Sequence, residues 1–161
     1  MNTSTKGSIA EAVIAAEAVK AGIRVYRPIV EGGRCDLVFE AEDRFLRVQC
    51  KSGSRKGAVI VVRLSTCRLT PRGYLYTTYS ASEVDAIAVY CPDVDRCYFV
   101  PIADVPGQTY LHLRLTPAAN NQEAAIRYAA QYELRGAIAQ LGERLTGSQE
   151  AGGSSPPSST S

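Results

Sequence analysis

Apolar and polar residues alternate from Gly32 to Ser54, with a helical pattern before this stretch and several strand patterns after it. Side chains of a β-strand point alternately to the two faces of a sheet. The alternation predicts one strand over residues 35–40 and a second from Phe45 to Lys51. Residues 41–44 between them, three of which are charged, have the length of a hairpin turn. The stretch is therefore interpreted as a β-hairpin.

The turn position sets the register of this hairpin and decides which side chains meet. Closing the turn at residues 41–44 pairs Glu40 with Phe45, and counting outward pairs Asp36 with Gln49. Lys51 shares the face of Gln49 because it lies two residues further along the same strand. The opposite face of the second strand is apolar and carries Leu46, Val48 and Cys50.

The chemistry of the three polar residues indicates a hydrolytic site. A carboxylate and a carboxamide oxygen are hard ligands that suit Mg²⁺, which also keeps waters and substrate phosphates. A lysine beside them stabilises developing negative charge or orients a water. Asp36, Gln49 and Lys51 together are the parts needed for metal-assisted phosphodiester hydrolysis. The alternative is a solvated sheet face with an Asp–Lys pair.

The remaining pattern predicts two helices and several strands. The helices are expected over Gly7–Ala21, ended by Gly22, and over Gln122–Leu134. The further strands are expected over Ile23–Ile29, Ala58–Leu64, Val84–Cys91, Cys97–Ile102 and Tyr110–Leu115. Residues 1–6 are polar and are expected to be frayed. The order of helix, strands and helix indicates an α/β (α+β) fold.

Glu11 has two interpretations. Ser8 and Glu11 match the S-x-x-E capping box, in which the glutamate closes the first turn of the helix. Alternatively, Glu11 faces the hairpin and helps to hold a metal ion. The residue pattern alone favours the cap.

Basic residues concentrate between Arg44 and Arg72, where eight Lys or Arg occur without any Asp or Glu. Such an excess suits a phosphate backbone, although a solvated surface explains it equally well. Residues 52–57 form a basic stretch that is expected to be a flexible loop beside the site. Aromatic residues accompany basic ones again within 66–82, where burial in a sheet is the alternative. The candidate DNA-binding residues are Ser52, Ser54, Arg55, Lys56, Arg68 and Tyr74.

Composition narrows the class of protein. The chain has 161 residues, a net charge of +2, five cysteines and one histidine. No C-x-x-C pair occurs, so zinc-ligand spacing is absent. Free cysteines, and no signal peptide or membrane-spanning run, lead to the expectation of a cytoplasmic protein.

Glu11, Asp36 and Gln49-x-Lys51 together resemble the PD-(D/E)XK nuclease superfamily, with glutamine replacing the usual third acid. The blocks GSIAEAVIAAEAVKAGIRVYRP, CDLVF, LRVQCKSG and VDAIAVYCPDVDRCYFVP occur in order and are similar to the group I intron homing endonuclease branch. The resemblance covers about residues 6–134. The proline of the superfamily motif is replaced by Cys35.

This resemblance implies a restriction-endonuclease-like core with a central mixed β-sheet flanked by helices. It implies that Glu11, Asp36 and Gln49 hold Mg²⁺ and that Lys51 is the catalytic lysine. It also implies cleavage of double-stranded DNA by a homo-oligomer, a dimer or a tetramer. The alternatives are a Holliday-junction resolvase or repair nuclease of the same fold, and a nucleic-acid-binding protein with a decayed site.

The chain is expected to form one nuclease domain over residues 1–138, followed by a tail. Residues 139–161 are rich in Gly, Ser and Pro and are expected to be disordered. The segments AQLGERL and GGSSP resemble reading frames of tRNA D- and T-arms, so this tail is interpreted as read-through coding.

Overall fold

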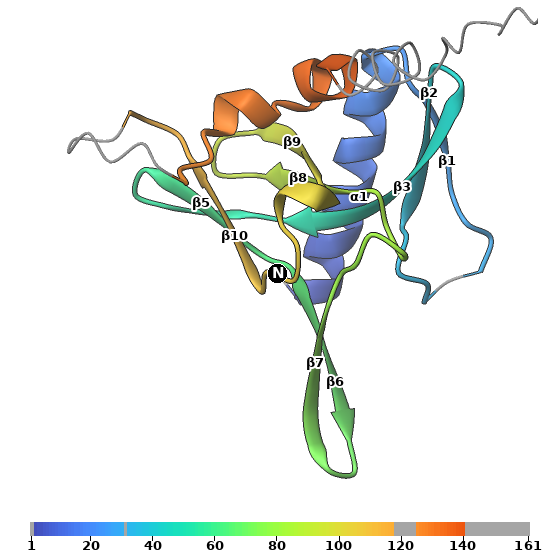
Figure 1. The fold of residues 1–161 in the computed structure, drawn as a ribbon, viewed down its shortest axis with the longest axis vertical. Coiled ribbons are helices and arrows are strands. Elements are labelled where there is room, and N and C mark those ends of the chain that lie inside the picture. Colours follow the sequence, from blue (N-terminus) through green and yellow to red (C-terminus); the bar gives the residue numbers. More distant parts are fainter. Residues whose placement is uncertain (1, 31, 118–124, 141–161) are drawn as a thin grey trace, which may run out of the picture.

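A mixed five-stranded sheet forms the centre of the computed structural model, which describes residues 2–30, 32–117 and 125–140 (Figure 1). Its strands lie in the order β1 (Arg24–Tyr26), β2 (Leu37–Ala41), β3 (Arg44–Ser52), β8 (Ala86–Cys91) and β9 (Arg96–Pro101). The β3–β8 pair is parallel and the other neighbours are antiparallel. The predicted α/β fold class with a central mixed sheet is confirmed.

Helix α1 (Thr3–Lys20) covers one face of this sheet. Its residues Ala10, Ile14 and Ala18 are fully buried, and their spacing of four places them on one side of the helix. They share a core with the apolar face of β3, namely Leu46, Val48 and Cys50, as the alternation predicts. Residues 134–140 are also helical, and Leu134 and Ile138 join the same core.

The opposite face of the central sheet is covered by a smaller sheet. Its strands lie in the order β10 (Tyr110–Arg114), β5 (Val59–Arg63) and β4 (Ser54–Lys56). Ile60 and Val62 of β5 and Leu111 of β10 are buried in one core with Ile87 and Val89 of β8. Strand β8 is therefore covered on both faces, which explains its nearly continuous apolar sequence.

Strands β6 (Ser65–Thr70) and β7 (Gly73–Thr78) form a separate two-stranded antiparallel ribbon. Figure 1 shows this ribbon, in green, extending away from the body of the molecule. Pro71 and Arg72 make the turn, and Gly73 follows with φ 110°, a left-handed conformation that favours glycine. The short 3₁₀ helix η1 (Ile102–Asp104) connects β9 to β10.

The start of α1 differs from the sequence prediction. The helix begins at Thr3, and the Asn2 side chain caps it by accepting a hydrogen bond from the Thr5 N–H at 3.0 Å. Ser8 and Glu11 therefore lie inside the helix, and the capping-box interpretation is wrong. The expected fraying of the N-terminus is also wrong for residues 2–6, while residue 1 lies outside the described residues. The predicted end at Gly22 is confirmed by its φ of 84° and by the Ile23 N–H bond to Ala18 O.

Asn2→Ala is expected to lower the free energy of unfolding by about 1 kcal/mol, because it removes a side-chain cap. Ser8→Ala serves as the matched control, since the Ser8 hydroxyl only bonds back to the Ser4 carbonyl within the helix. Urea denaturation followed by circular dichroism measures both. Equal losses in the two variants would contradict the position of the cap.

Residues 52–57 are not the flexible loop that the sequence suggests. Ser54–Lys56 form β4, which pairs antiparallel with β5. Gly53 lies so close to the core that an added Cβ would meet Ile60 Cγ2 at 2.9 Å and Val89 Cγ1 at 3.1 Å. This glycine therefore permits a close approach between the two sheets, and it is not a source of flexibility.

The final helix predicted over Gln122–Leu134 is wrong in its described part, and residues 122–124 lie outside it. Residues 125–128 are extended or turn, followed by the 3₁₀ helix η2 (Ala129–Tyr132). Two isolated bridges, Arg114 to Tyr128 and Tyr98 to Glu133, tie this segment to β10 and β9. Tertiary pairing overrides the helical spacing of the alanines and tyrosines here.

Candidate active site

The β2–β3 hairpin has the register that its sequence predicts. Glu40 pairs with Phe45 and Leu37 with Val48. Asp36 comes directly before β2, and its N–H donates to the Val48 carbonyl at 2.9 Å. This anchoring fixes the Asp36 side chain beside the carboxyl-terminal half of β3.

The Asp36 carboxylate is held by β3. Its Oδ2 accepts hydrogen bonds from the Cys50 N–H at 2.8 Å and from the Gln49 side-chain amide. Gln49 is only 7% exposed, so this carboxamide is buried and paired. Burial raises the pKa of Asp36 above its ordinary value, against the opposing effects of the Cys50 N–H, Lys51 and Gln49. The predicted meeting of Asp36 and Gln49 is confirmed.

Lys51 is half-buried at the next position on the same face. Its Nζ lies 4.9 Å from the centre of the Tyr79 ring, which is 4% exposed. Burial lowers the pKa of Lys51, Asp36 opposes this shift, and the Arg34 guanidinium reinforces it. Burial also raises the pKa of Tyr79 to about 12, so its hydroxyl stays neutral. Asp36, Gln49 and Lys51 thus form one electrostatically coupled cluster.

Arg34 is a residue of this cluster that the sequence interpretation missed. Its guanidinium lies 4.1 Å from the centre of the Tyr79 ring and binds Thr66 Oγ1 at 2.9 Å. It also donates to the Thr78 carbonyl and forms an ion pair with Glu83 at 3.0 Å. Arg34 therefore links the base of the β6–β7 ribbon to the ring that contacts Lys51. Its position two residues before Asp36 was the available signal.

Glu11 lies on α1, and this helix packs on the face of the sheet opposite to Gln49 and Lys51. Its Oε2 forms an ion pair with Arg27 Nη2 at 3.3 Å. Burial is the main cause that raises the pKa of the Cys50 thiol, and the negative charges of Asp36 and Glu11 raise it further. Both carboxylates therefore act electrostatically on this position of β3. Arg27 is also near enough to lower the pKa of Asp36. The structure places Glu11 at the border of the cluster, beside Arg27.

The oxygen donors of this cluster are the Asp36 carboxylate and the Gln49 carboxamide. No group of three or more His, Cys, Asp or Glu gathers within residues 2–30, 32–117 and 125–140. At the hairpin, the position where a third acid would complete such a group is occupied by Gln49. Among the described residues, both hydrogen bonds to Asp36 end on Oδ2, and Oδ1 receives none. A carboxylate oxygen beside a carboxamide suits Mg²⁺, which needs few protein ligands.

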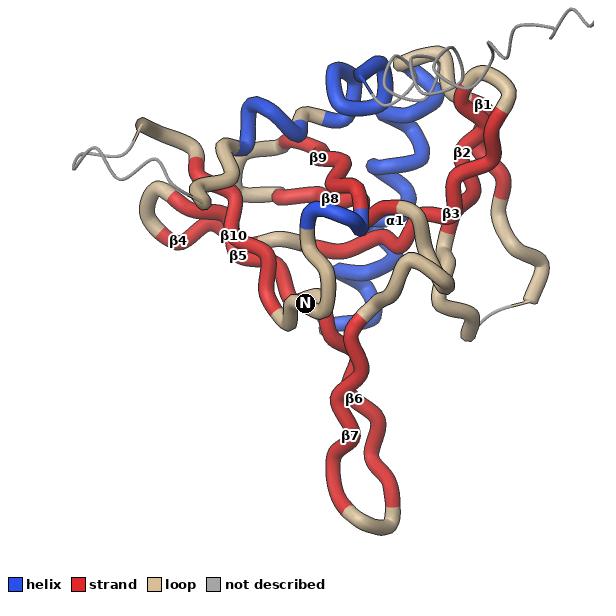
Figure 2. The backbone as a smooth tube through the Cα atoms, viewed as in Figure 1, coloured by secondary structure: helices blue, strands red, loops and turns tan. Residues whose placement is uncertain are grey.

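The candidate DNA-binding residues of the 52–57 segment lie in two settings. Ser52 is half-buried at the end of β3, while Ser54, Arg55 and Lys56 are exposed on β4. The Arg55 N–H donates to Asp93 Oδ2 at 2.7 Å, and its side chain bonds to the Gly57 carbonyl. In Figure 2, β4 and the β6–β7 ribbon lie at separate places on the molecule.

Arg68 and Tyr74 are both exposed on the ribbon, but they lie on different faces of it. The register pairs Leu69 with Tyr74 and Arg68 with Leu75. Because Arg68 and Leu69 are consecutive, the two pairs point in opposite directions. The sequence left DNA contact and burial open for these residues, and the structure shows both exposed, on opposite faces of the ribbon.

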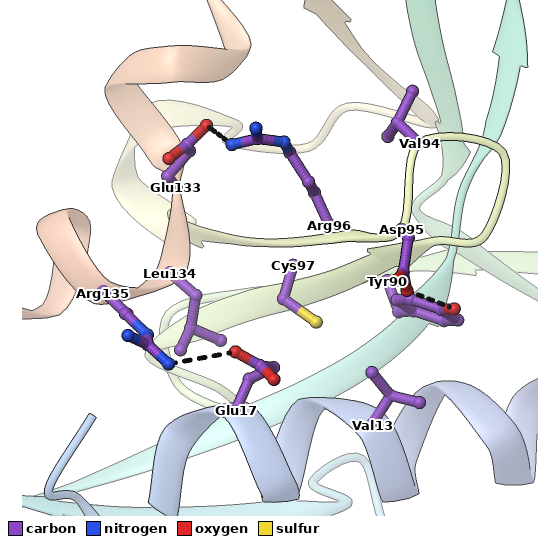
Figure 3. A pocket seen from close by; sticks show the side chains of 10 residues that line it. All are labelled: Val13, Glu17, Tyr90, Val94, Asp95, Arg96, Cys97, Glu133, Leu134 and Arg135. Atoms are coloured by element: carbon purple, nitrogen blue, oxygen red, sulfur yellow. Dashed lines mark hydrogen bonds and ion pairs between the residues drawn. The ribbon is translucent and has the colours of Figure 1, made fainter. Parts of the chain in front are cut away.

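A cavity of about 480 Å³ lies away from this cluster, between α1, the β8–β9 turn and residues 133–135 (Figure 3). Its charged side chains are paired across it, Arg96 with Glu133 at 2.6 Å and Arg135 with Glu17 at 3.6 Å. Burial raises the pKa of Cys97 in its wall to about 12, which makes this thiol unreactive. The cavity therefore carries no chemistry comparable to the hairpin.

The site thus combines a carboxylate directly before β2 with a carboxamide and a lysine on the neighbouring strand β3. A model of the PD-(D/E)XK endonuclease family matches residues 1–135, and the chain belongs to this family. The protein is therefore an endonuclease. Members of the family generally use divalent metal ions. No curated protein matches the chain significantly in sequence.

Two solved structures match the chain to different degrees. A bacterial homing endonuclease, I-Ssp6803I, matches with a TM-score of 0.71 and 24% identity, over 93% of this chain and 99% of that chain. The Holliday junction resolvase Hjc from Archaeoglobus fulgidus matches with a TM-score of 0.39 and 18% identity, over 68% of this chain and 84% of that chain. The first match shows the fold, and the second is too distant to inform the function. No helix in the described part of the chain is long and apolar enough to cross a membrane.

Proposed function

We propose that the protein is a Mg²⁺-dependent endonuclease that cuts double-stranded DNA at a specific sequence, as a homing endonuclease does. The observation that carries this proposal is the coupling of Asp36, Gln49 and Lys51 on one hairpin face, within a chain of the PD-(D/E)XK family. The likeness to I-Ssp6803I supports the homing type of activity. The proposed metal ligands are Asp36, Gln49 and Glu11.

Each residue of the site has a proposed role. Mg²⁺, when bound, supplies positive charge to the scissile phosphate and lowers the pKa of the attacking water. Asp36 Oδ1 provides the charged ligand, and its Oδ2 keeps the side chain in place through the Cys50 N–H. The Lys51 ammonium stabilises the negative charge that develops on the phosphate oxygens. Tyr79 and Arg34 position Lys51.

Glu11 has a different role in this proposal. Its ion pair with Arg27 neutralises one carboxylate at the border of the site. The Arg27 guanidinium also lowers the pKa of Asp36, so it stabilises the charge of both carboxylates before a metal is present. Glu11 would contribute a second carboxylate to a bound cation. Arg27 then lies beside the site, where it suits a DNA phosphate.

The proposed DNA contacts are the exposed basic residues around the site. Arg68 on the ribbon and Arg55 and Lys56 on β4 are assigned to the phosphate backbone, with Ser52 and Ser54 as hydrogen-bonding neighbours. Cutting both strands needs two active sites, so the functional form is a dimer or a tetramer. A two-fold axis then implies a palindromic or pseudopalindromic target.

Cleavage of a plasmid library with randomised inserts tests this function. Mg²⁺ is expected to yield linear products whose ends define one consensus site, and EDTA is expected to abolish them. Binding without cleavage on every substrate would favour the decayed DNA-binding protein. Preferential cleavage of four-way junctions would favour a resolvase, and uniform degradation would contradict site specificity.

A further inference from the structure

The β6–β7 ribbon has one face that is apolar and open to solvent. Cross-strand pairing places Cys67 opposite Tyr76 and Leu69 opposite Tyr74, so these four side chains share a face. Leu69 is 70% exposed, Tyr74 69% and Tyr76 56%. Cys67 is the exposed member of the five free cysteines. We call this set the apolar ribbon face.

The other face of the ribbon is mostly polar. It carries Thr66, Arg68, Thr70, Leu75 and Thr77, as the same register requires. Arg34 anchors this face to the body of the molecule through its bond to Thr66 Oγ1. The ribbon is therefore amphipathic, with Arg68 and three threonines on the side opposite to the two tyrosines.

A two-stranded ribbon of this kind needs a partner. An isolated hairpin is at best marginally stable in water and requires a further strand layer against its apolar face. Figure 2 shows that the ribbon stands clear of the other strands, and its large apolar side chains are more than half exposed. Exposed apolar surface of this kind marks an interaction site.

We propose that the apolar ribbon face packs against the same face of a second copy of this chain. None of its four residues is charged, so a two-fold contact places no like charges together. The Arg63 guanidinium lies over the Tyr76 ring, 5.2 Å from its centre. A phosphate backbone would instead be attracted to the face that carries Arg68.

The resulting contact is a small two-layered sheet. Two ribbons face to face pack about 10 Å apart, with Leu69 and Tyr74 of each copy enclosed between them. Both Arg68 faces then point outward and remain open to DNA. The inference rests on the proposed function only in that duplex cleavage requires two copies.

The test compares two charge insertions on the same ribbon. Leu69→Glu places a carboxylate on the apolar ribbon face, and Leu75→Glu places one on the opposite face at a similarly exposed leucine. Light scattering without DNA or metal is expected to give half the wild-type mass, or less, for Leu69→Glu. The Leu75→Glu protein is expected to keep the wild-type mass. A monomeric wild type, or equal masses for all three proteins, would overturn the proposal.

Cys67 provides a second measurement that does not depend on mass. Its reaction with a soluble maleimide is expected to be slow in the wild type and in Leu75→Glu, and at least tenfold faster in Leu69→Glu. A Cys67→Ser protein gives the background from the other thiols. Circular dichroism establishes that each variant is folded. Rapid labelling of Cys67 in the wild type would contradict a covered face.

Titration with double-stranded DNA tests whether DNA, and not a second copy of the chain, covers the apolar ribbon face. Arg68→Ala is expected to weaken binding and to reduce the salt dependence of log K by about 1, with the mass unchanged. If Leu69→Glu instead keeps the wild-type mass and loses DNA binding, the apolar ribbon face is a DNA contact and the proposal fails. Because the mass measurement uses neither DNA nor metal, equal masses for all three proteins would reject this interface and leave the proposed nuclease function untouched.

Discussion

Asp36→Asn is expected to reduce cleavage by more than about 100-fold, because it removes the charged ligand of the site. Loss of a residue that only supports a metal ligand already costs about 10–100-fold. Asparagine keeps the shape of the side chain and an oxygen for the Cys50 N–H. DNA binding is therefore expected to persist while cleavage is lost.

The same substitution is expected to raise the free energy of unfolding at neutral pH when a chelator is present. The pKa of Asp36 lies above its unfolded value of 3.8, because burial penalises the carboxylate. A carboxyl group with a raised folded pKa destabilises the fold when ionised, at pH above that folded pKa. The gain from asparagine should thus be full at neutral pH and disappear as the pH falls below 3.8.

Cleavage kinetics and urea denaturation across pH measure these two effects. Asp43→Asn is the matched control, since Asp43 lies exposed in the turn of the same hairpin. It is expected to change neither quantity. A loss of both activity and stability in Asp36→Asn would indicate a structural role for Asp36, and undiminished cleavage would remove it from the active site.

The central hairpin could be predicted from sequence because its determinants are local. Alternation and a short turn set the pairing of Glu40 with Phe45, and the meeting of Asp36 with Gln49 follows from the same count. The end of α1 was equally predictable, since Gly22 allows the left-handed conformation there. These features depend on neighbours within a few residues along the chain.

The errors arose where distant segments decide the structure. The basic stretch 52–57 resembles a loop, but pairing with β5 makes residues 54–56 a strand. Residues 125–133 have helical spacing, but bridges to β9 and β10 hold them otherwise. The sequence could not assign Tyr74 and Arg68 to faces, because only the register of the ribbon places them on opposite sides. Propensity and composition do not contain these long-range pairings.

The candidate site shows the same division. Asp36, Gln49 and Lys51 follow from strand alternation, whereas their surroundings do not. Tyr79 contacts Lys51 from a segment almost thirty residues later in the chain. It belongs to the core between the central sheet and the smaller sheet, on the side away from α1. Arg34 contacts Thr66 and Thr78, so its role depends on where the ribbon leaves the body. The structure thus adds the groups that tune the lysine.

Lys51→Met is expected to lower kcat by about 10²–10³-fold, the usual cost of losing one group that stabilises transition-state charge. Methionine keeps the length of the side chain and is suited to the half-buried position beside Tyr79. In the wild type, the rate is expected to fall at alkaline pH as Lys51 loses its proton. This decline should begin below the ordinary lysine value of 10.5, because burial and Arg34 both lower the pKa of Lys51. A cation bound beside Lys51 would lower this pKa further, because it disfavours the positive charge of the ammonium group.

Lys51→Arg separates the two possible roles of the lysine. Arginine stays protonated throughout the accessible range, so it is expected to restore part of the rate and to remove the alkaline decline. Lys56→Met is the control on β4, where loss of a phosphate contact weakens DNA binding and leaves the pH profile unchanged. A rate that instead rises with pH through the pKa of Lys51, without rescue by arginine, would show that the neutral amine activates the nucleophile. Full activity of Lys51→Met would exclude both roles and place the catalytic charge on Arg34 or Arg27.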